Sequence, residues 1–237
     1  MVIENEDSFI YEHNGINIEN EGSLHSAVKE WYSTYGDRLE ARVENSIIDI
    51  VRGDLLIEVQ TANFAAIRKK LAKLLKNHKI RLVYPIAKEK IITRVSASGE
   101  EVLSSRKSSK KGKVTDIFNE LVRIPALINE ENLTIEVLLI KEEEIRCEDG
   151  KGSWRRRGQS IIDKKLVEVF EKVEFSSKDD FLKLLPTDLC HPFTTKDLAG
   201  ACGYRVTEAR KIAYCLKKMG VINEVGKKGN SILYQIN

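Results

Sequence analysis

The strongest constraint on the fold is a pair of short apolar segments joined by a very tight turn. Residues 46–51 and 55–61 are rich in β-branched side chains, and the intervening Arg52-Gly53-Asp54 has the composition of a hairpin turn. A connection this short makes the two segments antiparallel neighbours. We therefore expect a β-hairpin here, with a further strand over residues 38–44 just before it.

The flanking segments have the periodicity of helices. Residues 24–35 predict an amphipathic helix that stops at Gly36, and residues 63–78 predict a second one. Residues 80–86 predict a strand that ends near Pro85. The expected order is therefore helix, three strands, helix, strand. The buried stripe of the first helix is expected to consist of Leu24, Ala27, Val28, Trp31 and Tyr35.

Acidic side chains occur inside the hairpin. Asp49 is set within the first apolar segment, while Glu58 and Gln60, two residues apart on the second, point to the same side. The tight turn allows Asp49 and Glu58 to lie close together on adjacent strands, where a divalent cation would relieve their repulsion. Oxygen ligands favour Mg²⁺ or Mn²⁺, and the carbonyl of Val59 could be a third ligand. Spacing alone is equally compatible with Asp49 and Glu58 being the solvent-facing positions of an ordinary hairpin.

This element order and these residues resemble the PD-(D/E)XK nuclease superfamily. The resemblance covers roughly residues 20–95 and includes the opening Ser23-Leu24-His25-Ser26-Ala27-Val28-Lys29. It implies an α/β (α+β) fold with a restriction-endonuclease-like mixed sheet flanked by helices. It also implies Asp49 and Glu58 as metal ligands, with Gln60 in the place usually held by lysine and Glu30 or Glu44 as an auxiliary acid. Ile48 stands where the family signature has proline.

The last sixty residues predict a second unit. Short helices at 179–185 and 195–201 precede a longer one at 206–219, and two strands at 221–225 and 231–236 follow. Helix, helix–turn–helix and a basic-tipped hairpin are typical of a winged helix. The exposed side chains expected to bind nucleic acid here are Arg205, Thr207, Arg210, Lys211, Lys227 and Lys228. A protein-contact module remains an alternative for this unit.

The charge distribution points to a polyanionic partner. The formal total is 39 − 36 = +3, but residues 1–22 carry six acids and no Lys or Arg, and residues 66–113 carry fifteen Lys and Arg against three Glu. Residues 96–113 predict a mobile basic loop, and residues 142–144, all Glu, predict a solvated edge after a strand over 133–140. Further nucleic-acid-binding candidates are Lys69, Lys73, Arg106, Lys107, Lys110, Lys111, Arg155, Arg156 and Arg157.

These observations predict four regions: an acidic arm (1–22), a nuclease-like domain (23–145), a basic connecting segment (146–175) and the winged helix (176–237). Residues 160–175 within the third region are compatible with either a helix or a strand.

The predicted function is a Mg²⁺- or Mn²⁺-dependent DNA nuclease acting on double-stranded DNA. A non-catalytic DNA-binding regulator and an RNA-binding or RNA-processing factor are the alternatives. The resemblance also implies a homodimer, since such nucleases often need two sites to cut both strands. No apolar run approaches the roughly 18 residues that span a bilayer, and four widely spaced cysteines suit a reducing compartment, so a cytoplasmic protein is expected.

Overall fold

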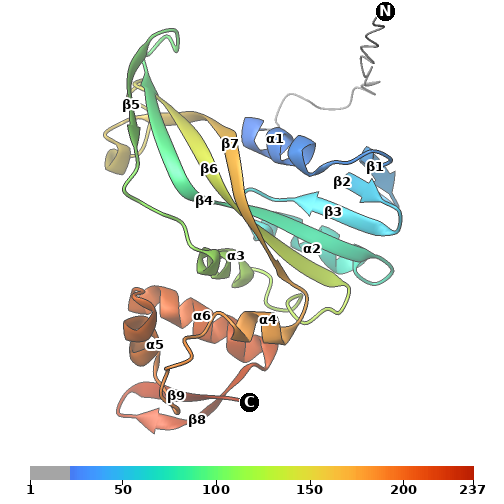
Figure 1. Cartoon of the computed structure of the whole chain (residues 1–237), viewed down its shortest axis with the longest axis vertical. Coiled ribbons are helices and arrows are strands. Elements are labelled where there is room, and N and C mark those ends of the chain that lie inside the picture. The colour runs from blue at the N-terminus through green and yellow to red at the C-terminus, as the bar shows by residue number, and fades with distance from the viewer. Residues whose placement is uncertain (1–21) are drawn as a thin grey trace, which may run out of the picture.

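A seven-stranded mixed sheet organises the computed structural model, which describes residues 22–237 (Figure 1). Apart from Gly22, the expected acidic arm lies outside the described residues. The strand order is β1-β2-β3-β4-β6-β7, and β5 pairs with β4. The strands are β1 (Arg38–Val43), β2 (Ser46–Arg52), β3 (Leu55–Val59), β4 (Lys79–Val95), β5 (Val102–Lys107), β6 (Leu133–Cys147) and β7 (Ser160–Phe175). The helical elements are α1 (Ser23–Tyr32), α2 (Phe64–Leu74), η2 (Val114–Ile117), α3 (Phe118–Leu121), η3 (Trp154–Arg156), α4 (Lys178–Leu182), α5 (Thr195–Cys202) and α6 (Val206–Met219). A separate hairpin near the C-terminus pairs β8 (Ile222–Lys228) with β9 (Ser231–Ile236).

The predicted hairpin is β2–β3. These strands pair antiparallel from Arg52 opposite Leu55 to Ile50 opposite Ile57, and Gly53 in the turn has a φ of +55°, which favours glycine. Strand β3 then pairs parallel with β4, β4 pairs parallel with β6, and β6 pairs antiparallel with β7. The predicted mixed sheet flanked by helices is thereby confirmed.

Helices cover the sheet on both faces. Helix α1 packs Leu24, Val28 and Tyr32 onto one face, and α2 and α3 pack onto the other (Figure 1). The predicted stripe of α1 is wrong at its end, because Trp31 is 43% exposed and Tyr35 is fully exposed. The helix stops at Tyr32, where the Arg52 guanidinium donates to the Tyr32 carbonyl at 2.9 Å. Tyr32 is therefore the aromatic residue that α1 buries.

Two central strands are much longer than predicted. Strand β4 runs 17 residues through Pro85, and β6 runs 15 residues. Backbone groups two residues apart point the same way, and the carbonyl of Val83 accepts the N–H of Gln60 on the β3 side. The missing N–H of Pro85 therefore faces the side where β3 has already ended, and it costs the sheet no hydrogen bond.

The expected mobile basic loop is largely ordered. Strand β5 pairs with the end of β4, and the segment after it is attached to β4 by the N–H of Ser108 on the Lys90 carbonyl and that of Gly112 on the Ala87 carbonyl, at 2.8 and 2.9 Å. A Cβ at Gly112 would lie 2.7 Å from the Ala87 oxygen, so only glycine fits this approach. Arg106 and Lys107 are consequently strand residues.

Two of the three glutamates in the acidic run of β6 are buried rather than solvated. Glu142 and Glu144 are 4% and 3% exposed, and Lys90 on β4 places its Nζ 2.8 Å from a carboxylate oxygen of each. The prediction of a solvated edge fails because β6 continues between β4 and β7 at this point. Strand β7, which pairs with β6 along its length, occupies most of the range predicted to be a connecting segment.

The C-terminal elements pack against the core of the sheet. Phe175 at the end of β7 stacks on Phe181 of α4 at a ring distance of 4.5 Å, and Phe181 also contacts Phe118 of α3 at 6.1 Å. Helix α6, with 14 residues, has the predicted bounds and buries Ile212 and Leu216 in the same core. None of the helices formed by residues 22–237 is long and apolar enough to cross a membrane.

Candidate functional site

The two predicted metal ligands lie where β2 and β3 separate. Their pairing ends at Ile50 and Ile57, so Asp49 and Glu58 are the first residues beyond the last pair. We call this place the fork. The side chains of Asp49 and Glu58 are only 18% and 7% exposed. The alternative of two solvent-facing hairpin positions is therefore wrong.

Asp49 is held by β3 and α1. Its Oδ2 accepts the N–H of Val59 at 2.8 Å and lies 3.3 Å from Nε2 of His25, which is also 2.9 Å from the Val59 carbonyl oxygen. Burial alone would raise the pKa of Asp49, but the hydrogen bond and charge of His25 and the Val59 N–H outweigh it and hold that pKa below its ordinary value. The Asp49 carboxylate and the Val59 carbonyl thus face a common point that His25 occupies.

Glu58 is in contact with a lysine of α2. Lys70 donates from Nζ to Glu58 Oε1 and to the carbonyl of Ile47. The other oxygen, Oε2, is buried and has no hydrogen-bond partner among residues 22–237. Burial first, and the charge of Asp49 second, raise the pKa of Glu58 to about 7, although Lys70 opposes them. The fork therefore contains a buried carboxylate with one unused oxygen.

The side chain of Gln60 is engaged by its own chain and not by the two acids of the fork. Its side-chain amide donates to the carbonyl of Ala62, two residues along its own chain. The positive charge near the acids belongs to Lys70, which lies between Ile67 and Leu71 on the half-buried side of α2. Lys70 was not among the predicted site residues, although its position beside the apolar stripe of the helix could have identified it. No comparable pattern in the sequence marks His25.

The two proposed auxiliary acids are outside the fork. Glu30 is exposed on α1. Glu44, which follows β1, pairs with Lys73 at 3.0 Å and lies 3.4 Å from Nε2 of His78. His25 and Lys70 occupy the positions around the acids instead.

The predicted nucleic-acid-binding residues fall into separate groups. Lys69 and Lys73 are exposed on α2, although Lys73 is engaged by Glu44. A second group comprises Arg106 and Lys107 on β5, and a third is the η3 loop, where Arg156 is half-buried and donates to the Gln159 carbonyl. The exposed members of these two groups are Arg106, Lys107, Arg155 and Arg157, and those of β8 are Lys227 and Lys228.

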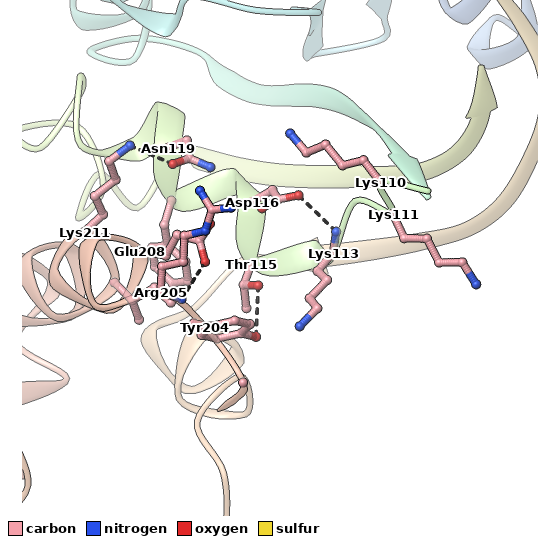
Figure 2. A pocket seen from close by; sticks show the side chains of 13 residues that line it. Lys110, Lys111, Lys113, Thr115, Asp116, Asn119, Tyr204, Arg205, Glu208 and Lys211 are labelled. Carbon is pink, nitrogen blue, oxygen red and sulfur yellow. Dashed lines mark hydrogen bonds between the residues drawn. The ribbon is translucent and has the colours of Figure 1, made fainter. Parts of the chain in front are cut away.

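The remaining candidates differ in whether they line a cleft beside the start of α6. Arg205 and Lys211 line a cleft of about 360 Å³ that also contains Lys110 and Lys111 (Figure 2). Thr207 and Arg210 are exposed and do not line it. We call this feature the basic cleft and define it by its five cationic residues, Lys110, Lys111, Lys113, Arg205 and Lys211.

The fork suits a small hard cation. Residues 22–237 contain no group of three or more His, Cys, Asp or Glu arranged to hold a metal ion. The donor set at the fork is instead two carboxylates and the Val59 carbonyl, all oxygen ligands of the kind that Mg²⁺ and Mn²⁺ prefer. The unused Oε2 of Glu58 fits such an ion, whereas the point faced by Asp49 Oδ2 and the Val59 oxygen would accept one only after His25 Nε2 moves away from it.

Comparison with known proteins assigns the chain to a family. A protein-family model described as "Domain of unknown function (DUF8091)" matches residues 22–176 of this chain. The chain is similar to an uncharacterized protein of Treponema pallidum (strain Nichols), with 34% identity over 221 residues that span 93% of this chain and 87% of the relative. No solved structure matches. The match to the family model covers the whole sheet, including the fork and all strands from β1 to β7, and the chain belongs to the DUF8091 family.

Proposed function

We propose that this protein is a metal-dependent DNA nuclease whose active site is the fork. The observation that carries the proposal is a buried carboxylate, Glu58, with one unused oxygen, beside the half-buried carboxylate of Asp49 and the ammonium group of Lys70. Mg²⁺ or Mn²⁺ would be held by Asp49, Glu58 and the Val59 carbonyl. Such an ion, when bound, polarises a phosphate and lowers the pKa of an attacking water.

The chain's own residues have defined roles in this proposal. His25 Nε2 holds the Asp49 Oδ2 and the Val59 carbonyl oxygen toward a common point, and it would have to leave that point for an ion to bind there. Lys70 places a positive charge beside Glu58, where it offsets the negative charge that develops on a phosphate during cleavage. We assign to Lys70 the role that the family resemblance implied for Gln60, whose amide is engaged by Ala62.

The nuclease proposal includes the C-terminal unit as a winged helix that binds duplex DNA. Thr207 and Arg210 lie on the face of α6 that points away from the core, and Lys227 and Lys228 lie at the end of β8. Within residues 22–237, neither Arg210 nor these two lysines forms an ion pair. Unpaired cations at a helix surface and a hairpin tip suit contacts with base edges and phosphates.

A non-catalytic DNA-binding protein is the second candidate. Two observations favour it: the Gln60 amide donates to the Ala62 carbonyl, and His25 Nε2 lies between the Asp49 carboxylate and the Val59 carbonyl. In this alternative the charged groups of the fork only stabilise the fold.

Cleavage assays separate the two candidates. Supercoiled plasmid, linear duplex, single-stranded DNA and RNA of matching sequence are incubated with the full chain and Mg²⁺ or Mn²⁺. We expect cleavage of DNA that is abolished by EDTA and lost in Glu58→Gln and in Asp49→Asn. Asp54→Asn, an exposed carboxylate in the turn of the same hairpin, is the matched control and keeps full activity.

Each other outcome rejects the proposal in a defined way. Salt-sensitive DNA binding without cleavage of any substrate supports the second candidate. Cleavage of RNA alone supports RNA processing. Cleavage that survives both fork substitutions would assign the activity to a different site.

A further inference from the structure

The basic cleft is built by segments far apart in the sequence. Its walls are the extended segment after β5, the chain around η2 and α3, and the start of α6 with the turn before it (Figure 2). Lys110 and Lys111 leave the extended segment in opposite directions (Figure 2). Lys113, Arg205 and Lys211 bring positive charge to the cleft from both sides.

The cations of the cleft are not neutralised by acidic side chains. Among the described residues, none of the five forms an ion pair within 4.0 Å. The cleft contains two acids, so its formal charge is 5 − 2 = +3. Asp116 and Glu208 are engaged in helix capping, where they accept the backbone N–H groups of Lys113 and Arg205 at 3.1 and 3.0 Å. The positive charge is therefore available to a ligand.

The cleft is held in shape before any ligand binds. The Lys113 ammonium lies 4.6 Å from the ring centre of Tyr204, whose hydroxyl accepts a hydrogen bond from Thr115 at 3.0 Å. Lys211 Nζ donates to Asn119 Oδ1 at 2.8 Å (Figure 2). The contact of Gly112 with Ala87 anchors the segment that carries the lysines. An arrangement that is already ordered loses little conformational entropy on binding.

The cleft adjoins the proposed duplex-binding face of α6 and extends beyond it. At 3.6 residues per turn, Arg205 and Glu208 lie on the side of α6 toward the cleft, and Lys211, one turn after Thr207, lies at its boundary with the face that carries Thr207 and Arg210. The cleft therefore adds the lysines of the segment after β5 to the positive charge at the start of α6.

We infer that the basic cleft is a phosphate-binding site that holds neighbouring phosphate groups of one ligand. Several unpaired cations around a volume of about 360 Å³ match a compact polyanion better than a single carboxylate. Neighbouring phosphates occur in a single nucleic-acid strand and in a free di- or triphosphate, and the experiment distinguishes these sources. The inference does not depend on catalysis at the fork.

Binding is measured on the full chain in EDTA, with pyrophosphate, inorganic triphosphate and a short single-stranded DNA oligonucleotide as probes. The double variant Lys113→Gln/Lys211→Gln removes two cleft charges. Lys76→Gln/Lys196→Gln removes two exposed charges, one in the turn after α2 and one on α5, both outside the cleft, and is the matched control. We expect the cleft variant to weaken binding about tenfold or more, because each phosphate contact is a charge-assisted hydrogen bond. The control should retain wild-type affinity.

The probes identify the source of the phosphate. If the oligonucleotide displaces pyrophosphate, the ligand is a nucleic-acid strand. The affinity of the wild-type chain for the oligonucleotide should then fall steeply as the salt concentration rises, and that of the cleft variant should fall less steeply. If only the free phosphates depend on the cleft lysines, the ligand is a small polyphosphate. Equal affinities of the two double variants, or no binding of any probe by the wild type, would overturn the inference.

Lysine acetylation provides a measurement that needs no variant. Bound ligand should protect Lys113 and Lys211 of the wild-type chain from acetylation, read by mass spectrometry, while Lys76 and Lys196 react at unchanged rates. Equal reactivity of Lys113 and Lys211 with and without a saturating probe would contradict the inference even if the variants fail to fold.

Discussion

The fork and the basic cleft contain similar charged groups in opposite physical situations. At the fork, Glu58 is buried and Asp49 is half-buried, each is contacted by a cationic side chain or a backbone donor, and their pKa values are shifted in opposite directions. In the cleft, Lys113 and Arg205 are exposed and have no carboxylate partner among the described residues. Water solvates an exposed charge, whereas a buried one needs a partner.

This difference determines what each place can bind. The partners at the fork leave one carboxylate oxygen unused, which a small cation can approach. The cleft leaves its ammonium and guanidinium groups open to a larger anion. Changes at the fork should therefore affect both stability and chemistry, and changes of cleft side chains should affect mainly binding.

The largest effect is expected at Lys70. Lys70→Met should lower the rate of DNA cleavage by about 100-fold or more, the usual cost of losing a group that offsets transition-state charge. Gln60→Ala should leave the rate within about threefold, since its amide is engaged by Ala62 and contributes no charge. Single-turnover rates of both variants at saturating Mg²⁺ are the measurement. If Gln60→Ala is the more damaging change, the assignment of the lysine's role to Lys70 is wrong.

The next effect is a pH dependence of stability that originates at Glu58. Its pKa is raised from 4.5 to about 7, so the folded state binds the proton more tightly than the unfolded chain. The resulting stability is fully present below about pH 4.5 and is lost as the pH rises through 7. We expect about 2–3 kcal/mol to be lost across this range without divalent metal. Urea unfolding should show this slope in the wild type and in Asp54→Asn, and Glu58→Gln should flatten it; an unchanged slope in Glu58→Gln would refute the prediction.

A smaller effect is expected where the cleft meets the sheet. In Gly112→Ala the new Cβ would collide with the Ala87 carbonyl and with Ile86, so the lysine segment must move away from β4. We expect a loss of about 1–3 kcal/mol of unfolding free energy together with weaker phosphate binding. Gly200→Ala is the control, because a Cβ there meets nothing within 4 Å and helix α5 should gain about 0.5–1 kcal/mol. A Gly112→Ala variant with wild-type stability and affinity would show that the segment is not anchored.

Local features of the fold could be predicted from the sequence. The hairpin at β2–β3 follows from Gly53 and its β-branched neighbours, and α6 follows from an apolar period of 3.6 that ends at Gly220. Each of these signals acts within a few residues, where sterics and backbone hydrogen bonds decide the conformation. The full lengths of β4 and β6 could not be predicted, because a strand continues for as long as a distant partner pairs with it.

The candidate site was predictable only in part, for the same reason. The sequence by itself determined that Asp49 and Glu58 would lie on neighbouring strands, because the tight turn between them leaves no other arrangement. Only the tertiary structure decided that Glu58 is buried and Asp49 half-buried, and that His25 and Lys70 are the residues beside them. It also brought the segment after β5 to the start of α6, about ninety residues further along the chain, to form the basic cleft. Packing of the two helices and of the C-terminal unit on the sheet made these contacts, and local sequence patterns do not encode which distant surfaces will meet.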